Sequence, residues 1–148
     1  MKQLKVDAIR NGTVIDHIPA GRVLRVLDII SPRESDVAMI GMGFSSKAMG
    51  KKDIIKIEGR ELTAEEVNSI ALIAPAAKVN IIRDFKVVKK GQVEIPETIE
   101  GLVRCPNPNC ISNHEPVTSR FSVLKPEPVT LCCSYCERTY LAHEMESV

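Results

Sequence analysis

Four cysteines near the end of the chain fall into two short groups. Cys105 and Cys110 form the first group, and Cys133 and Cys136 form the second. Four thiolates can close a tetrahedron around one Zn²⁺ ion and leave no coordination position for a substrate. The spacing therefore predicts one structural zinc ion per chain. Without this metal we expect the last third of the chain to be unfolded.

Other chemistry is open to these cysteines. They could form disulfides, a redox CxxC pair, or thiols that pack as small apolar groups. The five cysteines are odd in number, and a redox pair does not need the second cluster CPNPNC. The start MKQLKVDAIR also lacks a signal-peptide core, so we expect a reduced, cytoplasmic chain. These observations favour zinc.

Two residues beside the cysteine groups leave the ligand set open. Cys132 stands next to Cys133 in CCSYC, which gives two possible registers for the second group. We choose Cys133 with Cys136, because CxxC is the spacing whose backbone amides can curl toward the sulfurs. His114, in the loop SNHEP, could replace a cysteine, although a lone histidine in such a loop is usually just solvated.

Two lysines in the segment KDIIKIE carry the second candidate chemistry. In a strand, Lys52, Ile54 and Lys56 lie on one face, and the roots of the two lysines are about 13 Å apart. This separation suits an extended ligand such as a nucleotide. Nearby, Asp16 could accept hydrogen bonds from ribose hydroxyls, and His17 could face phosphate or base. The alternatives are a solvated lysine edge and a pair of turn residues.

The hydrophobic pattern predicts an α+β fold for the first part of the chain. Thr63 and Glu66 form a capping box that begins a helix. The order of elements is typical of a ferredoxin-like antiparallel sheet with two helices. The segment GQVEIPETIEG follows as a linker, so we expect domains at 1–95 and 96–148, the second a small zinc-bound β domain. The expected strands are 4–9, 36–42, 52–58, 77–82 and 85–88, the expected helices are 21–30 and 64–74, and 36–42 pairs with 52–58 as a hairpin around GFSSKAMG.

Charge and composition exclude several classes of protein. Residues 1–95 carry 16 basic and 12 acidic side chains, whereas residues 96–148 carry 4 basic and 7 acidic ones. The acidic second half disfavours a phosphate backbone, and with no Trp, two Tyr and three Phe the chain has few rings to stack bases. No apolar run approaches the length of a membrane span. We find no nucleophile, acid-base pair or glycine-rich phosphate loop, so we expect no catalysis.

Several strings resemble the regulatory chain of aspartate carbamoyltransferase over nearly the full length. They are KVDAIRNGTVIDHIPAG, MGKKDIIKIE, APAAKVNIIRDFKVV and CPNPNCISNHEPV, with CCSYC after them. The resemblance implies a noncatalytic subunit of pyrimidine biosynthesis. Its first domain would bind ATP or CTP and pair with a second regulatory chain, and its zinc domain would grip the catalytic chain.

The resemblance also implies roles for individual residues. The base would be contacted by the backbone of Asp7, Ala8 and Ile9, the ribose by Asp16 and Lys56, and the phosphates by His17, Lys52 and Lys90. The pocket would be completed by Ile54, Asn80, Ile82, Phe85 and Val87. The metal ligands would be Cys105, Cys110, Cys133 and Cys136, and the catalytic chain would be faced by Asn107, Asn109 and Glu137.

The chain departs from the family pattern at three of its residues. Phe85 replaces a tyrosine, Asp7 stands where a longer carboxylate is common, and Cys132 replaces a basic residue. The first two bear on base preference. Two other classes of protein remain: a zinc-ribbon nucleic-acid binder, and a small zinc enzyme, which would need an open metal position.

Overall fold

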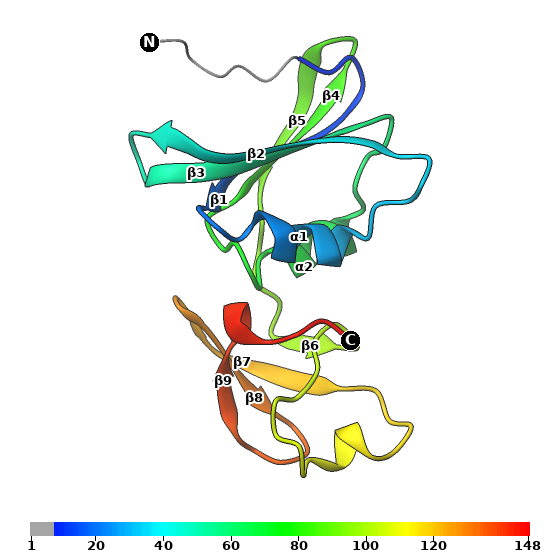
Figure 1. Ribbon diagram of the computed structural model, residues 1–148, viewed down its shortest axis with the longest axis vertical. Helices are drawn as coiled ribbons and strands as arrows, with labels where there is room; N and C mark the ends of the chain where they lie inside the picture. Colours follow the sequence, from blue (N-terminus) through cyan, green and yellow to red (C-terminus); the bar gives the residue numbers. More distant parts are fainter. Residues whose placement is uncertain (1–7) are drawn as a thin grey trace.

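Two antiparallel sheets carry the described part of the chain, residues 8–148, in this computed structural model (Figure 1). The first sheet has the strand order β2-β3-β1-β4-β5, and every neighbouring pair in it is antiparallel. Its strands are β1 (Gly12–Pro19), β2 (Val37–Ser46), β3 (Gly50–Glu58), β4 (Lys78–Arg83) and β5 (Lys86–Gln92).

The helices α1 (Val23–Ile30) and α2 (Ala64–Ile70) cover one face of this sheet (Figure 1). Alternate side chains of β1 and β3, among them Ile15, Ile55 and Ile57, are fully buried against them. Removing such a side chain from water contributes about 1.5–3 kcal/mol, and this burial fixes which face of the sheet stays open. The predicted ferredoxin-like layer of two helices on an antiparallel sheet is confirmed.

The capping box at the start of α2 forms as its sequence predicts. The Thr63 hydroxyl accepts from the Glu66 amide at 3.2 Å, and the Glu66 carboxylate accepts from the Thr63 amide at 3.1 Å. The helix ends at Ile70, four residues before the predicted end, and residues 71–74 continue as tighter turns. Pro75 contributes to this end, since it has no N–H to donate to the Ala71 carbonyl and it disfavours helical geometry at Ala74.

The first described strand, β1, begins after the range 4–9 that the sequence predicted. Residues 4–7 of the range 4–9 lie outside the described residues, and residues 8 and 9 are not in a strand. We expected the first strand to end before Asp16 and His17, but β1 contains both residues. A bulge between Ile15 and Ile18 interrupts its alternation of buried and exposed side chains, so the segment has the appearance of a turn.

The β2–β3 hairpin is confirmed but is longer than predicted. The ladder runs from Val37 paired with Glu58 to Ser46 paired with Gly50, and it absorbs most of the segment read as a loop. A bulge between Gly41 and Phe44 lets the pairing continue. The proposed linker 91–101 is also partly structured. Strand β5 extends into it as far as Gln92, and β6 (Thr98–Glu100) lies near its end.

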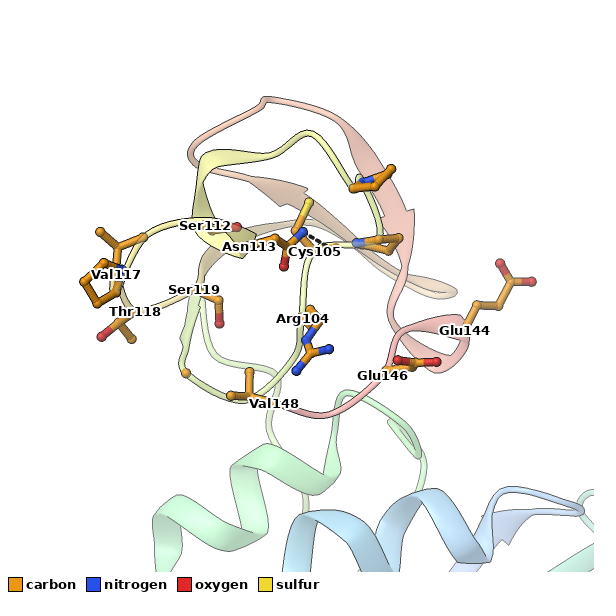
Figure 2. Close-up of a pocket in the computed structure, with 14 residues that line it drawn as sticks. Arg104, Cys105, Ser112, Asn113, Val117, Thr118, Ser119, Glu144, Glu146 and Val148 are labelled. Carbon is orange, nitrogen blue, oxygen red and sulfur yellow. Dashed lines mark hydrogen bonds between the residues drawn. The ribbon is translucent and has the colours of Figure 1, made fainter.

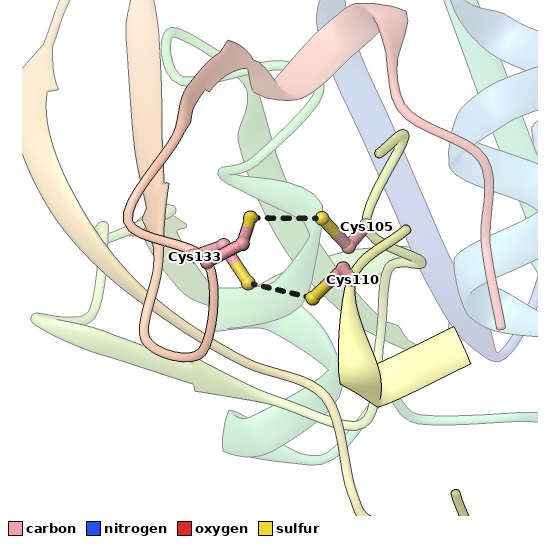
Figure 3. Close-up of side chains that lie close together, drawn as sticks. Cys105, Cys110 and Cys133 are labelled. Atoms are coloured by element: carbon pink, nitrogen blue, oxygen red, sulfur yellow. Dashed lines mark hydrogen bonds between the residues drawn. The ribbon is translucent and has the colours of Figure 1, made fainter. Parts of the chain in front are cut away.

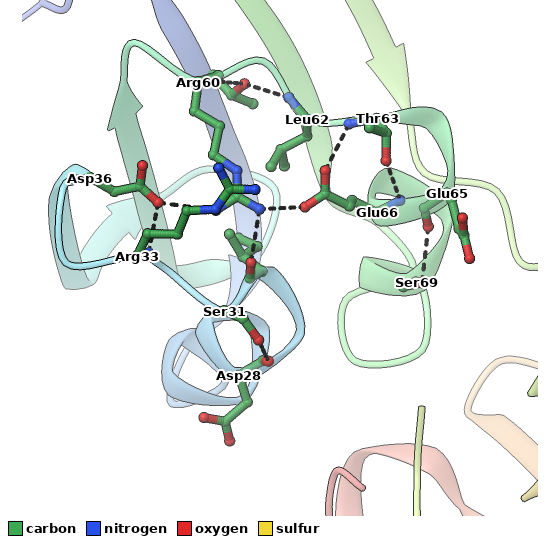
Figure 4. A network of polar contacts seen from close by, with 12 residues as sticks. Asp28, Ser31, Arg33, Asp36, Arg60, Leu62, Thr63, Glu65, Glu66 and Ser69 are labelled. Carbon is green, nitrogen blue, oxygen red and sulfur yellow. Dashed lines mark hydrogen bonds and ion pairs between the residues drawn. The ribbon is translucent and has the colours of Figure 1, made fainter. Parts of the chain in front are cut away.

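Arg60 ties together the loops on the helical side of the first sheet (Figure 4). Its guanidinium pairs with Asp36 at 3.1 Å and with Glu66 at 2.6 Å, and it donates to the carbonyl of Ile30 at 3.0 Å. The fully buried hydroxyl of Thr13 donates to the Arg60 carbonyl at 2.8 Å. These contacts connect the end of α1, the start of β2 and the start of α2, so they hold the helices to the sheet.

The second sheet has the order β6-β7-β8-β9, with β7 (Arg120–Pro126), β8 (Val129–Cys133) and β9 (Thr139–Leu141) after β6. Short 3₁₀ helices, η1 (Ile111–Asn113) and η2 (Ala142–Glu144), flank it. We call this part the metal domain, residues 98–148. It lies on the helical side of the first sheet (Figure 1), and Arg25 of α1 donates to the carbonyl of His143 at 2.8 Å across the boundary.

Candidate metal centre and binding face

The sulfurs of four cysteines meet at one end of the metal domain (Figure 3). Cys105 and Cys110 lie in the connection between β6 and β7, Cys133 ends β8, and Cys136 lies in the turn before β9. Their Sγ atoms all lie within 4.8 Å of one another, and the pairs Cys105–Cys136 and Cys110–Cys133 are each 3.7 Å apart.

This geometry fits a tetrahedral metal and not a disulfide. Metal–sulfur bonds of about 2.3 Å in a regular tetrahedron require sulfur–sulfur edges of about 3.8 Å. A disulfide would bring two sulfurs to about 2.05 Å, and all five cysteines are free thiols. The disulfide alternative is therefore wrong, and the four sulfurs form a closed donor set that suits a structural ion.

The two residues that left the ligand set open both lie outside the cluster. The Cys132 thiol donates to the Cys133 carbonyl at 3.8 Å and does not join the other sulfurs. The His114 ring nitrogen Nε2 is 2.6 Å from the Pro108 carbonyl oxygen, so the ring makes its hydrogen bond within the segment 108–114. The cluster therefore contains Cys133 and Cys136, the pair that we chose from the CxxC spacing.

The cluster thiols differ in acidity for local reasons. Burial raises the pKa of Cys105 to about 12. Burial also opposes ionisation of Cys136, but hydrogen bonds from the Arg138 backbone and the Asn107 side chain lower its pKa to about 7. Burial is the main cause that raises the pKa of Tyr140 to about 12, and the hydrogen bond with Cys105 adds to it. This phenol therefore keeps its proton. Near neutral pH a metal must therefore displace a proton from Cys105.

We predict that metal affinity falls steeply as the pH is lowered from 8 to 6. The Cys105 thiol is protonated throughout this range and Cys136 gains its proton near pH 7, so binding releases protons at every pH. Each proton displaced weakens the apparent affinity about tenfold per pH unit. A competition titration against a chelator calibrated at both pH values measures the change, and equal affinities at pH 6 and pH 8 would contradict the assignment.

The open face of the first sheet gathers the predicted nucleotide-binding side chains in register. Lys56 of β3 pairs across to Val14 of β1, Val14 to Asn80 of β4, and Asn80 to Lys90 of β5. Lys52 and Ile54 share this face of β3, because the intervening positions 53 and 55 are fully buried on the helical side. Side chains from separate strands therefore form one row across the sheet.

The bulge in β1 places Asp16 and His17 beside Lys52. The Lys52 ammonium lies 3.0 and 3.1 Å from the two Asp16 carboxylate oxygens. His17 has a left-handed backbone, with φ of 60°, and its amide donates to the Asp16 carboxylate at 2.6 Å. Its ring nitrogen Nδ1 is buried and has no hydrogen-bond partner among the described residues. A carboxylate, an ammonium and an imidazole thus meet at this end of the face.

The remaining predicted pocket residues lie at the other end of the face. Ile82 pairs with Val87, and Phe85, whose side chain is 65% exposed, stands in the turn between their strands. The Phe85 amide donates to the Arg10 carbonyl at 2.9 Å, which holds the segment containing Ala8 and Ile9 against this turn. Asp7 lies outside the described residues.

A cavity of about 920 Å³ adjoins the metal centre (Figure 2). The segments around Cys105, the loop 112–119 and the last residues of the chain line it. The Ser119 hydroxyl is buried and has no hydrogen-bond partner in the described part of the chain. Sequence reasoning missed this cavity, because no local pattern signals a hollow formed by three irregular segments.

The residues expected to face the catalytic chain do not share one environment. Asn109 and Glu137 are exposed on the two cysteine loops, whereas Asn107 is only 8% exposed. The Asn107 carboxamide oxygen accepts from the Asn109 amide at 3.0 Å, so it shapes the loop from within.

In the part of the chain that the structure describes, none of the helices has the length and apolar character of a membrane span.

Comparison with known proteins identifies relatives of the whole chain. Residues 4–94 match the family model of the aspartate carbamoyltransferase regulatory chain, allosteric domain, and residues 97–146 match that of its metal binding domain. Curated regulatory chains of aspartate carbamoyltransferase are similar to it at 54% identity in Pyrococcus abyssi and in Thermococcus onnurineus, and at 51% in Methanothermobacter thermautotrophicus. These alignments cover 98%, 99% and 98% of this chain and 97%, 99% and 94% of the relatives.

Proposed function

The chain belongs to the family of aspartate carbamoyltransferase regulatory chains, and from that premise we propose that it makes this enzyme responsive to nucleotides. As a regulatory chain it is noncatalytic. The observation that carries the proposal is the row of polar and basic side chains on the open sheet face, separate from the closed thiolate cluster. A nucleic-acid-binding role is not favoured by these relatives.

We propose that ATP and CTP bind on the open face of the first sheet. Lys52 and Lys90 supply positive charge for phosphates. Both lie on the open face, Lys52 on β3 and Lys90 on β5, with β1 and β4 between them. Asp16 carries a carboxylate that can accept from ribose hydroxyls, and Lys52 already orients it. Asn80, in the middle of the row, offers donor and acceptor groups for the rest of the nucleotide.

We propose that the metal is Zn²⁺, and that the metal domain grips the catalytic chain. A closed set of four sulfurs is the donor set typical of structural zinc, and thiolates need the reducing cytoplasm to remain free. The ion would be held by Cys105, Cys110, Cys133 and Cys136 and would fix both cysteine loops in place. We place the domain boundary at 95/96, and the family models, which match residues 4–94 and 97–146, support this position.

Exposed groups on the metal domain support a protein partner. Asn109 and Glu137 project from the cysteine loops, and the large apolar side chains of Ile111 and Tyr135 are exposed near them in sequence. The neighbouring cavity adds the unpartnered hydroxyl of Ser119. Apolar side chains combined with unpartnered polar groups are typical of a surface that a partner covers.

We propose that two regulatory chains pair edge to edge through β2. This edge strand is ten residues long and carries no charged side chain, and Val37, Ile40 and Met42 are exposed on it. The opposite edge strand, β5, carries lysines that block such pairing. Two copies joined at β2 by a twofold axis would continue the antiparallel sheet from one chain into the other.

A single lysine in the middle of β2 should separate the pair. We expect Ile40→Lys to weaken dimerisation at least tenfold, because Ile40 is 43% exposed and the substitution would bury a charge against its own symmetry mate. Sedimentation velocity over a range of concentrations measures the effect. Val88→Lys, on the opposite edge strand, is the matched control, and a dimer that tolerates both changes equally would rule out the β2 interface.

The contacts between the two sheets support coupling of the nucleotide site to the metal domain. The buried carboxylate of Asp53, next to Lys52, accepts from the amides of Gly21 and Val23 at 2.9 and 3.3 Å and so holds the start of α1. The same helix reaches the metal domain through Arg25. Nucleotide binding would bias this arrangement by about 1–3 kcal/mol, the usual size of an allosteric coupling.

Mixing the zinc-loaded chain with the catalytic subunit from the same source tests the proposal. We expect a complex of defined mass that contains both chains, and we expect ATP and CTP to bind the isolated regulatory chain in calorimetry. Chelation of the metal should abolish the complex and leave nucleotide binding intact. Assembly that survives chelation would show that the folded metal domain is not what binds the catalytic chain.

A further inference from the structure

Hydroxyl groups lie against two of the cluster sulfurs. The Ser112 Oγ is 3.1 Å from the Sγ of Cys110, and the Tyr140 Oη is 4.0 Å from the Sγ of Cys105. A metal-bound thiolate has no proton to donate, so in the loaded site both contacts require the hydroxyl to be the donor. Ser112, in η1, lies between the two cysteine pairs along the chain, and Tyr140, in β9, follows the second pair.

A buried amide supports a third sulfur. The Asn107 side-chain oxygen accepts from the Asn109 amide at 3.0 Å, which leaves its NH₂ group as the donor that lowers the pKa of Cys136. Asn113 fixes the same loop from the other side, because its side-chain amide donates to the carbonyls of Cys105 and Asn107 at 2.9 and 2.8 Å. Asn107 is only 8% exposed, so its side-chain contacts lie within the cysteine loops.

We propose that Asn107, Ser112 and Tyr140 form a shell of side-chain donors that positions the thiolates and sets how slowly the metal leaves. Four thiolates around a divalent ion carry a net charge of about −2 in a largely buried site, and this charge needs donors to stabilise it. Partners of the ligating atoms typically change metal affinity by about 10–100-fold. Within this shell, Asn107 is a positioning residue for Cys136.

The proposal is tested by cobalt release from the full-length chain. Loading with Co²⁺ gives a thiolate charge-transfer absorption, and its decay after addition of excess EDTA gives the release rate. We expect roughly tenfold faster release from Ser112→Ala and a smaller increase from Tyr140→Phe, whose contact is longer. Asn107→Ala should also release faster, and Asn109→Ala should not.

Matched controls separate the donor shell from general damage to the domain. Tyr135→Phe removes a hydroxyl that donates to the Thr118 carbonyl at 2.8 Å and does not touch a sulfur, so we expect the parent rate. Ser112→Thr keeps the hydroxyl and should restore slow release. Parent-rate release from both Ser112→Ala and Tyr140→Phe, or fast release from Ser112→Thr, would overturn the proposal.

This inference rests on metal binding by the four cysteines, which is one part of the proposed function. The cobalt experiment uses neither nucleotide nor catalytic subunit, so a chain that regulates nothing could still pass it. Conversely, failure of the donor shell would leave the nucleotide site and assembly untouched.

Discussion

Replacing Cys110 with serine is expected to unfold the metal domain and abolish association with the catalytic subunit. Cys110 is fully buried in the cluster, and a serine hydroxyl does not replace a thiolate at a structural zinc site. Structural zinc contributes on the order of 10 kcal/mol in small zinc domains. A domain of this size cannot recover that loss from its own core. Gel filtration with the catalytic subunit measures association, and thermal unfolding followed by circular dichroism measures the fold.

Cys132→Ser is the matched control for this experiment. Cys132 neighbours a ligand in sequence but lies outside the cluster, so its variant should keep its metal and its partner. Nucleotide binding should survive in both variants, because the metal domain lies on the helical side of the first sheet and the nucleotide-binding residues lie on its open face. Equal loss of assembly in both variants, or normal assembly of Cys110→Ser, would contradict metal-dependent binding of the catalytic chain.

Replacing Lys90 with alanine is expected to weaken ATP binding by roughly 10–100-fold. Its position in register with Asn80 puts it on the open face, where it would neutralise phosphate charge. A hydrogen bond to a charged group contributes about 1.5–3 kcal/mol, which corresponds to this loss. Titration calorimetry of the isolated chain at constant ionic strength measures the affinity.

The neighbouring lysine provides the control for the nucleotide site. Lys89 pairs with Ile81, so it points to the other side of the sheet at nearly the same distance along β5. We expect Lys89→Ala to change the affinity less than about threefold, because only diffuse charge is lost. If the two variants weaken binding equally, the effect is nonspecific and the proposed phosphate contact is wrong.

The metal cluster was predictable from the sequence because its signal is local. Two pairs of cysteines at short spacing specify a tetrahedral site almost independently of the fold around them. The alternation of Lys52 and Lys56 with buried residues was equally readable, since a strand of period two fixes the face of each side chain. The capping box of α2 also follows from residues three positions apart.

The remaining features depend on contacts that no local pattern contains. The bulge at Asp16 and His17 breaks the hydrophobic alternation of β1, so the strand was predicted too early in the chain. Tyr140 reaches Cys105 from 35 residues away, and Arg25 reaches His143 from 118 residues away. These contacts exist only after the sheets have formed and packed, so spacing along the chain cannot reveal them.

The most direct test of the account is the activity of the reconstituted enzyme. The zinc-loaded chain is assembled with its catalytic subunit, and activity is measured against aspartate concentration with and without ATP and CTP. The account predicts that at least one nucleotide shifts the aspartate dependence of the complex and leaves the isolated catalytic subunit unaffected. A stable complex whose aspartate curve is the same with and without both nucleotides would contradict it.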